Sequence, residues 1–172
     1  MRHLGISSFA MILALGTSAV AAQAQSQMTR DKLLGTWRLV SWKTTTNGHV
    51  AYPLGDHPGG FAEYTPKRVF FMLVDPNRKA PALATLTDAE AGSLMKSSVA
   101  YTGKYDVDPV QTPDGVKVTI HVDAAASEAI NGTERVFFER VDGNEMIVKS
   151  PLALVPTTGL KSAVELHFVR AE

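Results

Sequence analysis

The chain has 172 residues, with 17 basic and 17 acidic side chains and no cysteine. Balanced charge lacks the basic surface by which nucleic acid is usually held, so nucleic acid is not an expected partner. Without cysteine there is no disulfide, no thiolate nucleophile and no cysteine-based zinc site, and stability must come from packing.

Residues 1–24 have the features of a secretory signal peptide. Arg2 supplies a positive charge, residues 9–20 are largely apolar, and residues 22–24 form a small-residue cleavage site. A membrane anchor is disfavoured, because the apolar stretch is interrupted and falls short of the roughly 20 residues that a spanning helix needs. We therefore expect a periplasmic or secreted protein that begins near Gln25 and keeps no stable membrane anchor after cleavage.

Residues 25–172 suit one domain in length and contain a series of short β-rich segments. Thr29 is expected to cap a short helical turn that ends at Gly35. Turn dipeptides such as Asn47-Gly48 and Asp114-Gly115 separate the strands and indicate an antiparallel meander. Eight strands are predicted, at 36–46, 60–65, 68–75, 99–107, 116–124, 133–141, 145–150 and 161–170.

One helix is expected between the third and fourth strands. Thr87 or Asp88 can cap it, and Leu94 and Met95 give it an apolar side. The strand at 68–75 is apolar on both sides, so one of its faces should be covered, and this helix is the candidate cover.

Most other strands alternate between apolar and polar residues. Val116, Val118 and Ile120 share one side of their strand, and Lys117 and Thr119 share the other. An eight-stranded sheet with one apolar face closes readily into a small barrel, which removes the sheet edges. A two-sheet sandwich is the alternative fold.

The first and last strands carry the most specific pattern. Gly35-Thr36-Trp37 follows the short helical turn, and Arg170 lies near the end of the chain. This arrangement resembles the calycin-type barrels, which place a Gly-X-Trp motif and a C-terminal arginine together. By alternation Trp37 shares its face with Leu39 and Ser41. Trp37 and Arg170 are expected to point inward and close one end of the barrel, with the guanidinium stacked on the indole.

Further motifs resemble the bacterial lipocalin-like domain. They lie at residues 52–55, 60–66, 101–105 and 132–135, and the resemblance covers most of residues 33–170. It implies an eight-stranded antiparallel up-and-down barrel with an internal cavity. It implies no particular reaction, because function depends on the site and not on the fold.

Five aromatic side chains are the candidate ligand-binding residues, with Met72 or Met146 beside them. They offer a small apolar or amphipathic ligand an apolar wall and two phenol hydroxyls. A barrel of eight strands is near the size at which side chains fill the interior, so a filled core is an equal alternative. The five are Phe61, Phe71, Tyr101, Tyr105 and Phe137.

No metal, cofactor or catalytic residue is predicted. The four histidines of the mature chain (His49, His57, His121 and His167) form no close pair of the kind that zinc sites use. The chain also lacks a Gly-X-Ser-X-Gly elbow and a glycine-rich phosphate loop.

Two alternatives to a ligand-binding barrel stay open. An isomerase or cyclase needs only a dry pocket and one or two polar groups, for which Tyr101, Tyr105 or Glu63 are candidates. A structural or interaction barrel would show an exposed apolar patch around Trp42 or Phe70. The sequence leaves the oligomeric state open.

Overall fold

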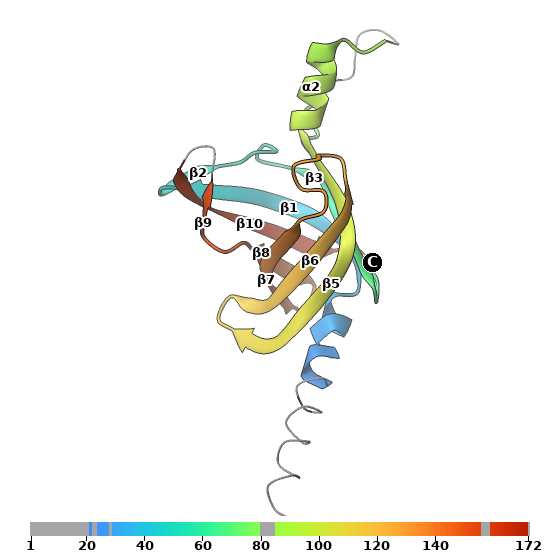
Figure 1. The fold of residues 1–172 in the computed structure, drawn as a ribbon, viewed down its shortest axis with the longest axis vertical. Coiled ribbons are helices and arrows are strands. Elements are labelled where there is room, and N and C mark those ends of the chain that lie inside the picture. The colour runs from blue at the N-terminus through green and yellow to red at the C-terminus, as the bar shows by residue number, and fades with distance from the viewer. Residues whose placement is uncertain (1–20, 22–23, 28, 80–84, 156–158, 172) are drawn as a thin grey trace, which may run out of the picture.

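The computed structural model describes residues 21, 24–27, 29–79, 85–155 and 159–171 (Figure 1). Almost all of the predicted signal peptide lies outside these residues. Residues 24–27 and 29–33 are helical, and the other helix is α2 (Asp88–Lys96). The strands are β1 (Gly35–Thr46), β2 (His49–Ala51), β3 (Gly59–Tyr64), β4 (Arg68–Val74), β5 (Ser98–Thr112), β6 (Gly115–Ala125), β7 (Glu134–Asp142), β8 (Glu145–Lys149), β9 (Ala153–Val155) and β10 (Leu160–Arg170).

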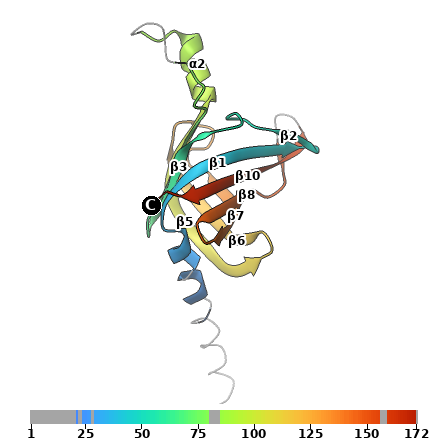
Figure 2. The same cartoon turned by 180° about the vertical axis from the view of Figure 1, so that it is seen from behind.

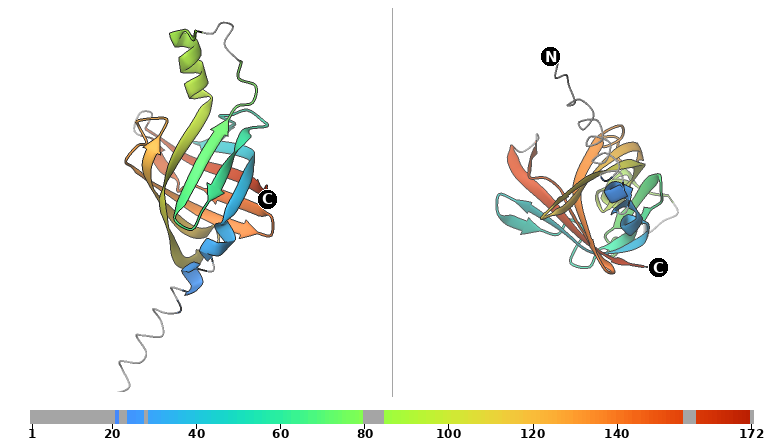
Figure 3. Two further views of the ribbon diagram at one scale, coloured as in Figure 1. Left: turned by 90° about the vertical axis from the view of Figure 1, so that its right-hand side faces the viewer. Right: turned by 90° about the horizontal axis from the view of Figure 1, so that it is seen from below.

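Eight strands form a closed antiparallel ring, which confirms the predicted barrel (Figure 3). The ring runs β1-β3-β4-β5-β6-β7-β8-β10, and β10 pairs with β1 to close it. The short strands β2 and β9 were not predicted. They extend β1 and β10 sideways beyond the ring, where residues 44–46 and 160–162 supply the pairing. Figure 2 shows this extension from behind.

A β-bulge in β1 changes which of its side chains face inward. The pairing with β10 is regular up to Leu39 and resumes at Ser41, so Val40 is an extra residue. Because one extra residue shifts the alternation, Trp42 faces the interior opposite Leu166. Ser41, which was expected inside, faces outward, and that prediction is wrong.

The N-terminal helix closes one end of the barrel, called the lower end here. The indole nitrogen of Trp37 donates a hydrogen bond to the carbonyl of Leu33 over 2.7 Å. Arg170 donates to the carbonyls of Leu34 and Lys32 over 2.8 Å and 3.1 Å. These carbonyls belong to the end of the helix, where no intrahelical donor remains for them. Arg170 and Trp37 therefore fasten the helix end to the barrel.

The expected cap of this helix is wrong. The Thr29 hydroxyl donates to the carbonyl of Gln25 over 3.0 Å, and Thr29 is itself helical, so its side chain does not serve as the expected cap. Arg30 joins the helix to the lower rim by donating to the carbonyls of Pro66 and Tyr105.

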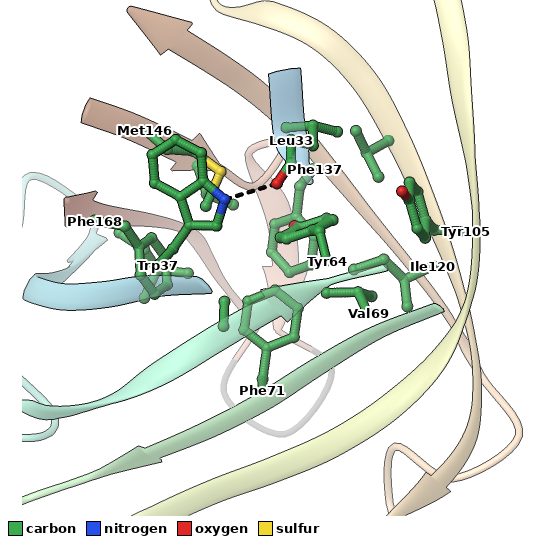
Figure 4. Packing of buried hydrophobic residues seen from close by; sticks show 14 of the residues in the cluster. Leu33, Trp37, Tyr64, Val69, Phe71, Tyr105, Ile120, Phe137, Met146 and Phe168 are labelled. Atoms are coloured by element: carbon green, nitrogen blue, oxygen red, sulfur yellow. Dashed lines mark hydrogen bonds between the residues drawn. The ribbon is translucent and has the colours of Figure 1, made fainter. Parts of the chain in front are cut away.

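Side chains fill the lower part of the lumen (Figure 4). The Tyr64 ring meets Tyr105 edge-on with 5.4 Å between centroids and Phe71 with 6.1 Å. Phe71 also stacks on Tyr101 at 4.8 Å and meets Phe168 edge-on at 6.4 Å. Continuous contact between rings leaves the lower lumen without room for a ligand of ordinary size. Fully buried around them are Leu33, Trp37, Val69, Val118, Ile120, Met146 and Val148.

The helix α2 has the predicted cap but does not cover β4. The hydroxyl of Thr87 accepts from the Glu90 amide, and the Glu90 carboxylate accepts from the Thr87 amide. However, α2 has no buried residue and projects from the upper end of the barrel (Figure 1). The outer side chains Phe70 and Met72 of β4 are 43% and 51% exposed. The predicted cover is therefore wrong, because α2 continues almost directly into β5 and extends past the end of the sheet.

Candidate functional site

An opening in the barrel wall lies beside the upper half of β7. The pairing of β8 with β7 begins at Lys149, opposite Phe138. Beyond Lys149 the chain stays with β10, where the Ser150 amide donates to the Val164 carbonyl over 2.9 Å. Residues 134–137 therefore pair only with β6. The resulting cleft, called the side opening, has a volume of about 470 Å³. Its lining residues are Glu134, Arg135, Val136, Phe137, Ser150, Pro151, Ala153, Leu154, Ser162 and Val164.

Arg135 and Phe137 bring the side opening into contact with the lumen. They pair with Ile120 and Val118, which are fully buried in the barrel interior. Directly opposed residues share a face of the sheet, so Arg135 and Phe137 point inward. The Arg135 guanidinium lies 5.8 Å from the centroid of the Phe137 ring.

Tyr101 lies near this arginine. Burial raises the pKa of the Tyr101 hydroxyl, and the positive charge of Arg135 opposes part of that rise. The hydroxyl makes no hydrogen bond with any residue that the structure describes. A phenol that is buried and free to donate can orient a polar group of a ligand.

The structure brings together four of the five predicted ligand-binding residues, in two groups. Phe71, Tyr101 and Phe137 are buried in the interior. Phe137 lines the side opening, whereas Phe71 and Tyr101 stack on each other and line a separate hollow at β3, β4 and β5. Tyr105 is also inside, but at the lower end, where its hydroxyl donates to the Thr65 carbonyl over 2.9 Å. Phe61 is 48% exposed on the outer face, so its predicted inward direction is wrong.

The reason for the Phe61 error is visible in β3. Ala62 and Tyr64 are buried, and alternation then places Phe61 outside, opposite Met72. Met72 is therefore an outer residue, whereas Met146 is fully buried in the interior.

Three residues of the upper lumen were missed by sequence reasoning. Arg135 has a signal, because it alternates with Phe137, but a charged residue was not expected on the inner face. Val164 lies on the same face as Leu166 and Phe168 but was not assigned to a site. Trp42 has no signal, because the bulge reverses its direction. Its indole nitrogen is buried and has no hydrogen-bond partner among the described residues.

A carboxyl group is buried at the lower end of the lumen. Glu139 is 2% exposed and accepts a hydrogen bond from the Tyr64 hydroxyl over 2.7 Å. Its other oxygen has no partner in the described part of the chain. Burial raises the pKa of Glu139 to about 7, although the bond from Tyr64 acts in the opposite direction. A small cavity of about 70 Å³ adjoins Glu139 and has room for ordered water.

The candidate catalytic groups do not converge. Glu63 lies on the outer face opposite Phe70, Tyr105 is at the lower end, and Tyr101 alone faces the upper lumen. No group of three or more His, Asp or Glu side chains among the described residues can hold a metal ion. In the same part of the chain, no helix is long and apolar enough to cross a membrane.

A second hollow lies on the outside of the barrel, over β3, β4 and β5. This outer groove has a volume of about 480 Å³; its lining includes the exposed side chains Phe61, Phe70 and Met72 and also the buried Phe71 and Tyr101. It holds an exposed apolar patch at Phe70, the feature that was named as a mark of the alternative structural or interaction barrel. Trp42, the other residue named for such a patch, is on the opposite side of the wall, in the interior.

Comparison with known proteins agrees with this architecture. The model of the lipocalin-like domain family matches residues 34–170. No curated protein and no solved structure matches the chain. The matched segment begins just before the Gly-X-Trp motif and ends at Arg170, and thus includes all strands of the closed ring. The chain belongs to the lipocalin-like domain family.

Proposed function

We propose that this protein is exported and binds a small apolar or amphipathic molecule in the upper lumen, which the molecule enters through the side opening. The observation that carries the proposal is the cleft of about 470 Å³ where β7 has no partner strand on its β8 side above Phe138. This volume falls within the range of ordinary ligand pockets, about 300 to 1,000 Å³.

The distribution of buried side chains supports the upper lumen over the lower. The Tyr64 ring, in contact with the rings of Tyr105 and Phe71, occupies the lower lumen. In the upper half, Trp42, Val99 and Val164 are only partly buried although they face inward. Apolar surface that the chain itself leaves uncovered is available to an apolar ligand, and its burial favours binding.

Polar groups near the opening support an amphipathic molecule. The Trp42 indole nitrogen is a buried donor without a partner among the described residues, and the hydroxyl of Tyr101 is a second donor. A few placed donors in an otherwise apolar site fix the orientation of a ligand and contribute its specificity.

Binding is tested by titrating the purified chain with N-phenylnaphthylamine, an uncharged probe that fluoresces in apolar surroundings. Val164→Trp places a larger ring in the side opening and is expected to weaken binding at least about tenfold, which corresponds to about 1.4 kcal/mol. The matched control is Phe70→Ser in the outer groove, which is expected to leave the affinity within about twofold.

Each result has a definite meaning. Loss of binding in Phe70→Ser but not in Val164→Trp would assign the probe to the outer groove and overturn the proposal. The same holds if the unaltered protein binds no probe. Mass spectrometry of small molecules released from the purified protein then identifies the natural ligand.

The proposal of export rests on residues 1–24. We expect the mature protein to begin near Gln25 and to be recovered from the periplasmic fraction or the medium of a Gram-negative host. Ala24→Arg puts a large charged residue at the small-residue cleavage position and should retain the longer form. Recovery of uncleaved, unaltered protein from the cytoplasm would contradict export.

A further inference from the structure

We infer that the ligand is an organic anion and that Arg135 holds its charged group. This inference rests on the proposed function, since it concerns the same site in the upper lumen. It adds the chemical class of the ligand and names the side chain that selects it.

The fold directs the Arg135 side chain into the barrel. Arg135 is opposite Ile120, which is fully buried, and it shares its face with Phe137 two residues later. Its neighbour Glu134 faces outward, where its carboxylate lies 3.1 Å from the Nδ1 atom of His121. The nearest acidic side chain in sequence also lines the side opening, but it faces outward and is already paired with His121.

Arg135 has no compensating carboxylate on the inner face. No salt bridge or hydrogen bond joins its guanidinium to another residue in the part of the chain that the structure describes. The inward carboxyl group, Glu139, is bound to Tyr64 at the lower end, and burial raises its pKa to about 7. The outer cation Lys43 differs in this respect, because it pairs with Glu165 over 2.7 Å.

The second inward arginine makes the contrast clear. Arg170 stacks on Trp37 and donates to two carbonyls of the N-terminal helix. Its charge is therefore used in closing the barrel, whereas Arg135 has only a ring contact with Phe137 at 5.8 Å. A partly buried guanidinium without an acceptor is unfavourable, and a bound anion would relieve this.

The surroundings of Arg135 suit a carboxylate or sulfonate on an apolar body. A guanidinium can donate two parallel hydrogen bonds to such a group. The Tyr101 hydroxyl is close enough for the two groups to affect each other electrostatically, and it can supply a further donor. Phe137 and Val164 provide apolar surface on either side of the opening.

Two probes with the same aromatic skeleton test this assignment. Anilinonaphthalene sulfonate carries a sulfonate that N-phenylnaphthylamine lacks, so their difference in affinity measures recognition of the charge. Both are titrated into the unaltered chain, Arg135→Gln, Arg135→Lys and Arg140→Gln. Arg140 is the matched control, because it is an exposed arginine on the same strand.

We expect Arg135→Gln to weaken binding of the sulfonate probe at least about tenfold while changing binding of the neutral probe by less than about twofold. Arg135→Lys should keep part of the preference, since it retains the charge without the planar fork. Arg140→Gln should change neither affinity. Unfolding midpoints measured for each variant confirm that the fold is retained.

Two results overturn the inference and leave the proposed function intact. In one, Arg135→Gln weakens both probes equally, which indicates a packing effect. In the other, the unaltered protein binds the neutral probe as tightly as the sulfonate and Arg135→Gln has no effect. If the unaltered protein binds neither probe, the proposed function fails and the inference fails with it.

Discussion

The guanidinium of Arg170 lies over the indole ring of Trp37, 4.1 Å from its centroid. The two residues come from the last and first strands of the ring, which pair directly at this point. Trp37 is fully buried, and both side chains also bind carbonyls at the end of the N-terminal helix. One contact thus joins the strands that close the barrel and the helix that covers its lower end.

Replacing Arg170 should destabilise the protein. Arg170→Ala removes the ring contact and two hydrogen bonds from a charged donor, and we expect the free energy of unfolding to fall by about 3 kcal/mol. Urea denaturation measures the change. Arg38→Ala, at an exposed position on β1, serves as the control and should change stability by less than about 0.5 kcal/mol. Equal effects of the two substitutions would contradict a closing role for Arg170.

Glu139 should make stability depend on pH. Burial raises its pKa from 4.5 to about 7 in the folded state. The contribution of Glu139 to the free energy of unfolding is complete below pH 4.5. It is lost progressively as the pH rises and is fully lost above about 7, because between these values the carboxyl group ionises readily only in the unfolded chain. The shift corresponds to about 3 kcal/mol.

Glu139→Gln should flatten this pH dependence, because the amide does not ionise. The free energy of unfolding of the variant, compared with that of the unaltered protein, should therefore be larger at pH 8 than at pH 5. Denaturation of both proteins at both pH values measures this difference. His121, on the outer surface, has a raised pKa because of its hydrogen bond to Asp106, and its contribution is also lost with rising pH. That contribution is common to both proteins. Parallel pH profiles for the two would contradict an ionisable Glu139 in the core.

Gly103 should not tolerate a side chain. A Cβ atom at this position would lie 2.2 Å from the backbone carbonyl oxygen of His121 in β6. Gly103→Ala must separate β5 from β6, and we expect a loss of about 2 to 4 kcal/mol in the free energy of unfolding.

Gly92 provides the contrasting position for that test. It lies inside α2, and a Cβ atom there meets nothing within 4 Å. Gly92→Ala should therefore raise stability by up to about 1 kcal/mol, because alanine is the better helix former. If Gly103→Ala changed the free energy of unfolding as little as Gly92→Ala does, β5 and β6 would be less closely apposed than the 2.2 Å distance indicates.

Trp42 should report on occupation of the upper lumen. Trp37 is fully buried, so acrylamide should quench Trp42 preferentially among the two tryptophans. Saturating decanoate is expected to reduce the quenching about twofold or more, because a bound ligand shields surface that the free protein leaves partly exposed. Trp42→Phe should remove the quenchable component. Unchanged quenching with decanoate bound would place that ligand away from Trp42.

The barrel itself was predictable because its strongest signals are local. Alternation with a period of two marked most of the ring strands, and dipeptides such as Asn47-Gly48 marked their turns, where both residues adopt positive φ. The same rule, applied strictly to β3, would have placed Phe61 outside, since Tyr64 lies three residues away and is buried.

The candidate site was predictable only in part. The inward direction of Tyr101 followed from alternation, whereas that of Phe71 did not, because its strand is apolar on both sides. The inward direction of Trp42 was not predictable, because the bulge at Val40 is a property of the pairing between β1 and β10. Such a bulge depends on how two distant strands fit together, and it reverses every side chain beyond it.

The sequence by itself determined the strand order, the apolar inner face and the meeting of Trp37 with Arg170. These features follow from local periodicity, turn chemistry and the two ends of one closed ring. The tertiary structure alone decided that the lower lumen is filled, that α2 leaves β4 uncovered and that the wall opens beside Arg135. The reason is physical: whether the lumen is filled and where the wall opens depend on how side chains and strand ends from distant segments meet in space. The chain departs from β7 because its pairing with β10 continues past Lys149.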